Sequence, residues 1–256
     1  MARPPGVWNP QRMNLDRRGA LRGRAVGAAV ALIIGLTACG RGGDSSGGDG
    51  FADQSAAEIQ KQVVADMARL KSVRLSGELI QNGREVGIDV ALNTDGMCAG
   101  SLTLMGGSAE IIAGPDGQFV KGDKAFWTGT AGGESAAEQV TALLGDKWAK
   151  MPEVEGGFTS FCDLDDLLDE FDSVDAADGE ARIGKQAQIG GILALELISE
   201  DDSPTSAWVA VEAPHYIVQL SADGQEAGSI VFTDFDQPVN AEAPAAEDVV
   251  DLSKSR

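Results

Sequence analysis

Residues 72–93 read SVRLSGELIQNGREVGIDVALN, and this stretch decides the fold of the chain. Apolar and polar residues alternate on both sides of Asn82-Gly83, which is the strongest short signal for a two-residue β-hairpin turn. With Gln81 paired to Arg84 across that turn, the apolar residues face one another as Leu79 with Val86, Leu75 with Val90 and Val73 with Leu92. A slip of one residue would turn one of these sets toward water, so the pattern and the turn predict the same register.

The same succession of short strands and turn residues continues along the chain. Turns are expected at Asp95-Gly96, Gly106-Gly107 and Pro115-Asp116-Gly117, with strands at 99–105, 108–113 and 118–121. Further strands are expected at 181–188, 192–199, 207–212, 216–221 and 228–233. The Gly190-Gly191 turn leaves its register open, because Leu193, Leu195 and Leu197 would face Gln188, Gln186 and Gly184.

Three stretches have the spacing of amphipathic helices. Residues 55–71 place Ile59, Val63, Met67 and Leu70 three and four apart, with Ser55 and Glu58 positioned as a capping box. Residues 134–144 and 163–171 are the other two. The order of helix, strands, helices and strands predicts an α+β domain, in which one large antiparallel sheet carries its helices on one face.

An export signal precedes this domain. Arginines from Arg12 to Arg24 are followed by the mostly apolar residues 25–36, which are too few to span a bilayer and are typical of a signal peptide. The junction Leu36-Thr37-Ala38-Cys39 is typical of a lipoprotein, in which the thiol of Cys39 takes up a diacylglyceryl group. A secretory signal with a chance cysteine is the alternative. Arg17-Arg18 leaves general secretory or twin-arginine export open, and the start can be Met1 or Met13.

Three regions are therefore expected: a signal peptide over 1–38, lipidated Cys39 with a Gly/Ser/Asp tether over 39–50, and one domain over 51–256. The eleven residues 40–50 give the tether a root-mean-square span of roughly 18 Å. Loss of residues 1–38 leaves 14 basic and 39 acidic residues, a net charge of −25. This charge disfavours nucleic acids and anionic headgroups. A monomer held at the outer face of the cell membrane by the acyl chains of Cys39 is expected.

The residue types needed for catalysis or for a metal site are not arranged for either. His215 is the one histidine, no G-x-S-x-G motif marks a nucleophile, and a half-exposed strand position is expected for this residue. Several acidic residues cluster in the helix expected at 163–171, namely Asp163, Asp165, Asp166, Asp169, Glu170 and Asp172. Their spacing does not match a calcium loop and is typical of a solvated helix face. The sequence predicts no enzyme, no metal and no cofactor.

Cys98 and Cys162 are the two remaining cysteines, and export places both in an oxidising compartment. Cys98 shares its strand face with Leu102 and Leu104, so its thiol is expected on the apolar face, within reach of the segment that carries Cys162. A disulfide is predicted, with two buried free thiols as the alternative. In the chain-entropy model, a disulfide that closes the loop between Cys98 and Cys162 stabilises the fold by about 4 kcal/mol.

Several segments taken together resemble the LppX_LprAFG family of actinobacterial lipoproteins. They are the cleavage site with its tether, CAGSLTL at 98–104, AFW at 125–127, GDKWAKMP at 145–152, DLDDLL at 163–168, FTDF at 232–235 and DVVDL at 248–252. This resemblance covers nearly the whole mature chain. It implies a LolA-like half-barrel, in which a strongly curved antiparallel sheet has helices packed on its concave face over an apolar cavity.

The resemblance also implies a function, namely the binding and the transfer of a lipid or another amphiphile. The residues expected to line the cavity are Leu75, Leu79, Val86, Ile88, Val90, Leu102, Leu104 and Ile111, with Trp127 and Trp148 either at its rim or as anchors for the helix between them. The small residues Gly77, Gly100 and Ala109 would leave room for acyl chains, or they would permit curvature of the sheet. The alternative is a filled core, in a non-catalytic envelope scaffold that meets a basic partner.

Overall fold

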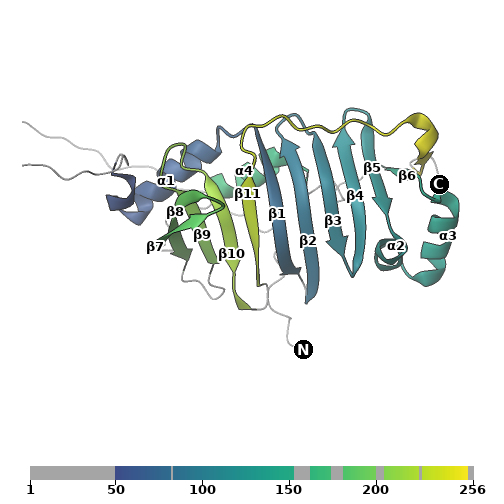
Figure 1. Cartoon of the computed structure of the whole chain (residues 1–256), viewed down its shortest axis with the longest axis horizontal. Helices are drawn as coiled ribbons and strands as arrows, with labels where there is room; N and C mark the ends of the chain where they lie inside the picture. Colours follow the sequence, from purple (N-terminus) through teal and green to yellow (C-terminus); the bar gives the residue numbers. More distant parts are fainter. Residues whose placement is uncertain are drawn as a thin grey trace, which may run out of the picture. The chain divides into compact units, whose positions relative to one another are not determined.

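The alternating segments pair into one open twelve-stranded sheet (Figure 1) in the computed structural model, which describes residues 50–81, 83–152, 162–173, 181–199, 205–224 and 227–252. Across the sheet the strand order is β12-β6-β5-β4-β3-β2-β1-β11-β10-β9-β8-β7. Every neighbouring pair is antiparallel except β12 and β6, which run parallel. The expected α+β class with one large antiparallel sheet is confirmed.

The strands are short and the helices few. The strands are β1 (Ser72–Gln81), β2 (Arg84–Asn93), β3 (Cys98–Leu104), β4 (Gly107–Gly114), β5 (Gly117–Gly122), β6 (Trp148–Met151), β7 (Arg182–Ile189), β8 (Ile192–Ser199), β9 (Thr205–Ala210), β10 (Ile217–Ala222), β11 (Gly228–Thr233) and β12 (Val249–Asp251). The helices are α1 (Ala56–Met67), α2 (Lys124–Thr130), α3 (Glu134–Leu144) and α4 (Leu164–Ser173), with short 3-10 helices at Phe51–Asp53 and Ala246–Asp248.

The β1–β2 hairpin has the register predicted from the sequence. Gln81 pairs with Arg84, and the apolar pairs from Leu79 with Val86 to Val73 with Leu92 form as expected. Across its other edge, β1 pairs with β11, so Leu75 lies opposite Phe232. The first and second halves of the chain therefore join in the middle of the sheet.

The ambiguous register at Gly190-Gly191 is resolved by an irregularity in β7. Leu193 and Leu195 face Gln188 and Gln186 as the simple register implies, but a shift between Ile183 and Gln186 sets Leu197 opposite Ile183 instead of Gly184. Such a bulge inserts residues into one strand and restores apolar pairing on the same face. An apolar side chain thus meets an apolar partner at the far end of the hairpin.

The helices cover one face of the sheet, which we call the inner face. Ile59, Val63 and Met67 of α1 are buried in the main core, and so is Leu164 of α4. At the other end of the sheet, Phe126 of α2 packs directly against Gly107 of β4 and Gly122 of β5. The prediction of helices on a single, concave face is confirmed, and Ser55 forms the predicted capping box with Glu58 at the start of α1.

Glycines on the inner face accompany the curvature of the sheet. A Cβ atom on Gly100 would lie 2.6 Å from the Cα atom of Val90, and one on Gly77 would meet the backbone carbonyl of Ser229. Neighbouring backbone already fills these positions. Of the two explanations for these glycines, the one supported here is curvature of the sheet, which brings the backbones of adjacent strands this close, and not room for a ligand.

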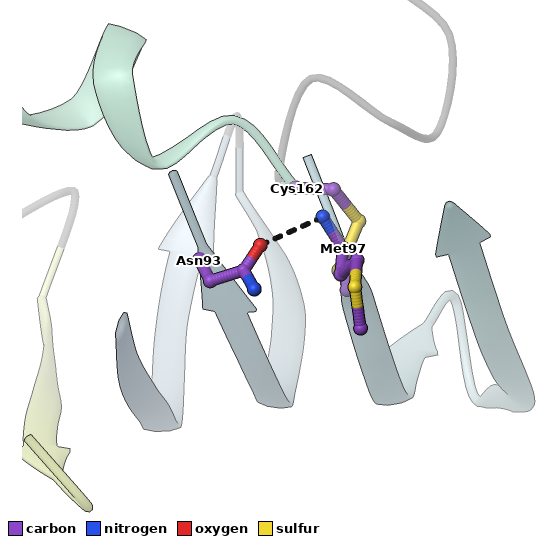
Figure 2. Close-up of a disulfide and its surroundings, with 4 residues drawn as sticks. Asn93, Met97 and Cys162 are labelled. Atoms are coloured by element: carbon purple, nitrogen blue, oxygen red, sulfur yellow. Dashed lines mark hydrogen bonds between the residues drawn. A yellow bond between two sulfur atoms is a disulfide. The ribbon is translucent and has the colours of Figure 1, made fainter. Parts of the chain in front are cut away.

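The predicted disulfide joins Cys98 at the start of β3 to Cys162, two residues before α4, with the Cα atoms 5.3 Å apart. Figure 2 shows how the preceding turn holds β3 in place. The side-chain oxygen of Asn93 accepts hydrogen bonds from the backbone N–H groups of Met97 (2.9 Å) and Asp95 (3.1 Å). The disulfide therefore ties α4 to a strand whose start is fixed by its own turn.

Three elements were not expected from the sequence, namely α2, β6 and β12. After β11, in the middle of the sheet, the chain runs past the ends of strands β1 to β5. It reaches the end of the sheet opposite β7, where β12 pairs with β6 (Figure 1). Cys39, the signal peptide and residues 40–49 of the tether lie outside the described residues. Residues Gly48–Arg256 form a compact unit by themselves. None of the helices in the described residues combines the length and the apolar character needed to cross a bilayer.

Candidate functional site

The inner face carries a continuous line of apolar residues, which we call the apolar row. Strand register places one residue from each of seven adjacent strands, β7 to β2, side by side. They are Ile183, Leu197, Ala207, Leu220, Ile230, Gly77 and Ile88. Because adjacent strands are about 4.8 Å apart, the row is about 29 Å long.

The apolar row is less well covered than the core beside it. Six of its seven members are half-buried, and Leu197 is 7% exposed. On the same strands, the neighbouring inner-face residues on the side toward the helices are almost fully buried. They are Leu195, Val209, Phe232, Leu75 and Val90. The helices thus cover one part of the inner face, and the apolar row lies along the border of the covered part.

Neither the apolar row nor the buried residues beside it include a charged side chain. Residues that alternate with the row point to the opposite, outer face of the sheet, and these include Glu196, Gln219 and Asp89. A surface that is apolar and partly exposed can bind hydrocarbon, because binding removes the exposed apolar area from water. It offers no ionic group that could recognise a charged head.

The residues predicted to line a cavity fall into two groups. Leu75, Val86, Val90, Leu102 and Ile111 are buried, with at most 8% of each exposed. Leu79, Ile88 and Leu104 are half-buried on the inner face. The second group is therefore the part of the predicted set that remains accessible, and Ile88 belongs to the apolar row.

Trp127 and Trp148 have different positions. Trp127 lies in α2 and is buried, its indole N–H donates to the carbonyl of Gly122 at 3.0 Å, and its ring meets that of Phe126 edge-on at 5.2 Å. Trp127 is thus an anchor that holds α2 against the sheet. Trp148 lies in β6 next to the fully buried Ala149, so alternation along the strand directs Trp148 to the outer face. We omit both from the proposed lining.

The members of the apolar row in the second half of the chain were not among the predicted residues. Ile183, Leu197, Ala207, Leu220 and Ile230 come from β7 to β11. Each has a polar residue on at least one side, but Leu197, Ala207 and Ile230 are followed by Ile198, Trp208 and Val231, so the alternation that marks a strand face is incomplete. They lie beside Ile88 only because β1 pairs with β11. This pairing joins residues more than 140 positions apart, and no local sequence pattern predicts it.

Within the described residues, a small and partly open recess lies near the disulfide. It is lined by Ile111, Ala113, Val120, Met151 and Cys162 together with Ile112, Gln118 and Phe119. Its volume is about 10 Å³, which is the size for about one water molecule. An acyl chain does not fit in this space, so the partly exposed apolar row is the better candidate for a binding site.

The expectation of a half-exposed His215 is wrong. His215 is 4% exposed and lies in the loop before β10, where its ring stacks on that of Phe51 with the centroids 3.8 Å apart. Its Nδ1 lies 3.1 Å from the carbonyl oxygen of Ala210, and its backbone N–H donates to Asp66. This histidine contributes to packing at the start of the domain.

The acidic residues of α4 lie on its exposed surface where they are described. The carboxylate of Asp163 accepts a hydrogen bond from the backbone N–H of Asp166 at 3.0 Å, and so caps the first turn. Asp165, Asp166 and Asp169 are exposed. No group of three or more potential metal-ligating side chains occurs within the described ranges.

The fold is similar to that of LprF from Mycobacterium bovis, with a TM-score of 0.52 and 13% sequence identity over 75% of this chain and 97% of LprF. The lipoprotein LppX from Mycobacterium tuberculosis has a TM-score of 0.48 and 16% identity, over 73% of this chain and 98% of LppX. No family model and no curated protein matches the sequence. At such identities the likeness to LprF shows the fold alone, and this is the type of fold that the sequence resemblance implied.

Proposed function

We propose that this chain is an exported lipoprotein, anchored at the membrane through acyl chains on Cys39, that binds a lipid or another amphiphile non-covalently on its inner face. The observation that carries the proposal is the partly exposed apolar row, which crosses seven strands without a charged residue. Binding there needs no covalent step, because the favourable free energy comes from apolar area removed from water. The protein then acts as a carrier or a binding protein and not as an enzyme.

The size of the effect follows from burial. Each apolar side chain that a ligand covers completely contributes about 1.5–3 kcal/mol. Members of the row are already half-buried, so each contributes less than this, and several must be covered together. A hydrocarbon chain that lies along the row meets this requirement, whereas a small polar metabolite does not.

Ile230 and its neighbour Val231 provide a matched test. Both are half-buried in β11, but Ile230 faces the apolar row and Val231 faces outward, opposite Ser76 and Gln219. We expect Ile230→Asp to weaken the binding of a fluorescent fatty acid by about tenfold or more, which corresponds to about 1.4 kcal/mol. Val231→Asp should leave the affinity within about twofold of the parent protein.

The measurement is a fluorescence titration of protein that begins at Gly48, with circular dichroism to establish that both variants are folded. Equal losses in the two variants would place binding elsewhere on the molecule. Absence of binding by the parent protein, for fatty acids and for phospholipids, would favour the alternative function, a scaffold with a filled core. The small volume of the recess at Met151 and Cys162 is the observation that favours this alternative.

A further inference from the structure

The hairpin that joins β7 to β8 ends in exposed apolar residues. We call residues Ile189, Gly190, Gly191, Ile192 and Leu193 the hairpin tip. Ile192 is 38% exposed and Leu193 is 40% exposed, and both glycines are exposed as well. Two large apolar side chains that are adjacent and exposed at a turn form a contiguous apolar surface, and such surfaces mark sites of interaction with a partner or a membrane.

The hairpin tip is linked through a series of contacts to Phe51, where the tether enters the folded domain; we call this point the tether root. Phe51, the second described residue, is fully buried and stacks on His215 at 3.8 Å. His215 lies 3.1 Å from the carbonyl oxygen of Ala210, and the next residue, Val211, donates its backbone N–H to the carbonyl of Leu193 at 2.9 Å. Three successive contacts therefore hold the tip beside the point where the chain enters the domain, at the same end of the sheet in Figure 1.

The position of the tether root limits how far the hairpin tip can lie from the membrane. Eleven residues separate Cys39 from Phe51, and a flexible segment of this length has a root-mean-square span of roughly 18 Å. With Cys39 lipidated, this span is the average distance expected between Phe51 and the headgroups, and the tip lies close to Phe51. The local concentration of bilayer surface around the tip is consequently high.

The charge of the hairpin suits a membrane surface, in contrast to the rest of the protein. Residues 186–195 contain no charged side chain, and the two charged residues before them in β7 are the exposed cations Arg182 and Lys185. The mature chain as a whole carries a net charge of −25, which anionic headgroups repel. Anionic headgroups therefore repel the acidic protein as a whole, but they do not repel the uncharged tip or the basic residues Arg182 and Lys185 beside it.

We propose that the hairpin tip is a membrane-docking element, which inserts Ile192 and Leu193 into the headgroup region of the bilayer that holds the acyl chains of Cys39. The proposal rests on the lipid anchor of the proposed function and gives the tethered domain a defined orientation. Apolar side chains bury their area at the interface, and Lys185 meets anionic headgroups. The acidic surface turns away from the membrane.

The test uses a site-specific fluorophore on the domain. Cys98 and Cys162 form the disulfide, so protein that begins at Gly40 with an N-terminal histidine tag has a single free thiol when Ile192→Cys is introduced. The tag is captured on vesicles of phosphatidylcholine and phosphatidylglycerol that contain a nickel-chelating lipid. This replaces the acyl anchor and keeps the tether, so the outcome is independent of lipidation at Cys39 and of ligand binding at the apolar row.

The control is Leu143→Cys, on α3 at the opposite end of the sheet, where Leu143 is 60% exposed (Figure 1). An environment-sensitive dye at position 192 should shift its emission to the blue on capture and be quenched by lipid-borne quenchers, and the dye at position 143 should respond to neither. With Leu193→Cys as a second labelled site, the same response is expected. No shift at positions 192 and 193, equal shifts at 143 and 192, or a shift that depends on protein concentration without vesicles would overturn the proposal.

The affinity of the tip is measured with protein that lacks the tag. Flotation with the same lipids should show that Ile192→Asp together with Leu193→Asp lowers the partition onto vesicles by about tenfold, whereas Leu143→Asp leaves it unchanged. Equal partition of the paired aspartate variant and the parent protein would contradict docking through the tip. Circular dichroism of each variant establishes that the fold is retained.

Discussion

At the scale of single residues, the start of the domain is held by a group of polar contacts around Asp236. Its carboxylate accepts hydrogen bonds from the backbone N–H of Lys71 at 2.8 Å and from the hydroxyl of Tyr216 at 3.0 Å. Burial and the hydrogen bond to Asp236 raise the pKa of Tyr216 to about 12, against about 10 in an unfolded chain. The protonated phenol is therefore the form that stabilises the fold.

Tyr216→Phe tests this contact. A raised pKa means that the stabilisation is fully present below about pH 10 and is lost as the pH rises through about 12. At neutral pH, we expect the variant to be less stable by about 1 kcal/mol, the usual contribution of such a hydrogen bond. The difference should shrink as the pH approaches 12. Urea unfolding at a series of pH values measures it.

The chain has one tyrosine, so the titration can be observed directly by the ultraviolet absorbance of tyrosinate. In the folded protein the absorbance should rise near pH 12, and in urea near pH 10. A folded-state midpoint close to 10 would show that burial and Asp236 do not act on this hydroxyl as described.

At the scale of elements, α4 is attached to the sheet by the Cys98–Cys162 disulfide and by the packing of Leu164. Replacement of both cysteines by serine should lower the free energy of unfolding by about 4 kcal/mol, the chain-entropy value for this loop length. Guanidinium unfolding measures the change. The matched control is reductant, which should destabilise the parent protein and leave the double variant unaffected. A reductant effect on the variant of the same size would refute this account of the disulfide.

Strong local patterns allowed most elements to be predicted from the sequence. The alternation around Asn82-Gly83 gave the β1–β2 register, and the capping box of Ser55 and Glu58 gave the start of α1. By contrast, α2 contains Gly129 and two threonines and has no apolar periodicity. Its signal is the cap at Asp123, whose carboxylate accepts from the N–H of Phe126 at 2.7 Å. The four residues of β6 and the three of β12 are too short to alternate recognisably.

The candidate site was predictable only in part. Leu79, Ile88 and Leu104 follow from the first hairpins, because local turns set their faces. Ile230 and Leu220 join them through the long-range pairing of β1 with β11 and of β11 with β10. Neither the bulge that aligns Leu197 with Ile183 nor the stacking of Phe51 on His215 has a signal in sequence spacing.

At the scale of the whole molecule, three features act together. The inner face of the described sheet carries the main apolar core, Phe51 and the hairpin tip lie at one end of the sheet, and residues 39–256 have a net charge of −25. In the proposed function, these features let an anchored domain remain next to the bilayer without lying flat on it and exchange hydrocarbon with the bilayer through the inner face. On this proposal, the inner face holds a ligand.

The most direct test of that claim is the native mass of protein purified without detergent after contact with lipid vesicles. We predict a non-covalent adduct with the mass of a lipid, which is lost on unfolding and strongly reduced in Ile230→Asp but retained in Val231→Asp. A spectrum that contains only the mass of the bare chain, before and after incubation with phospholipids and fatty acids, would contradict the proposed function.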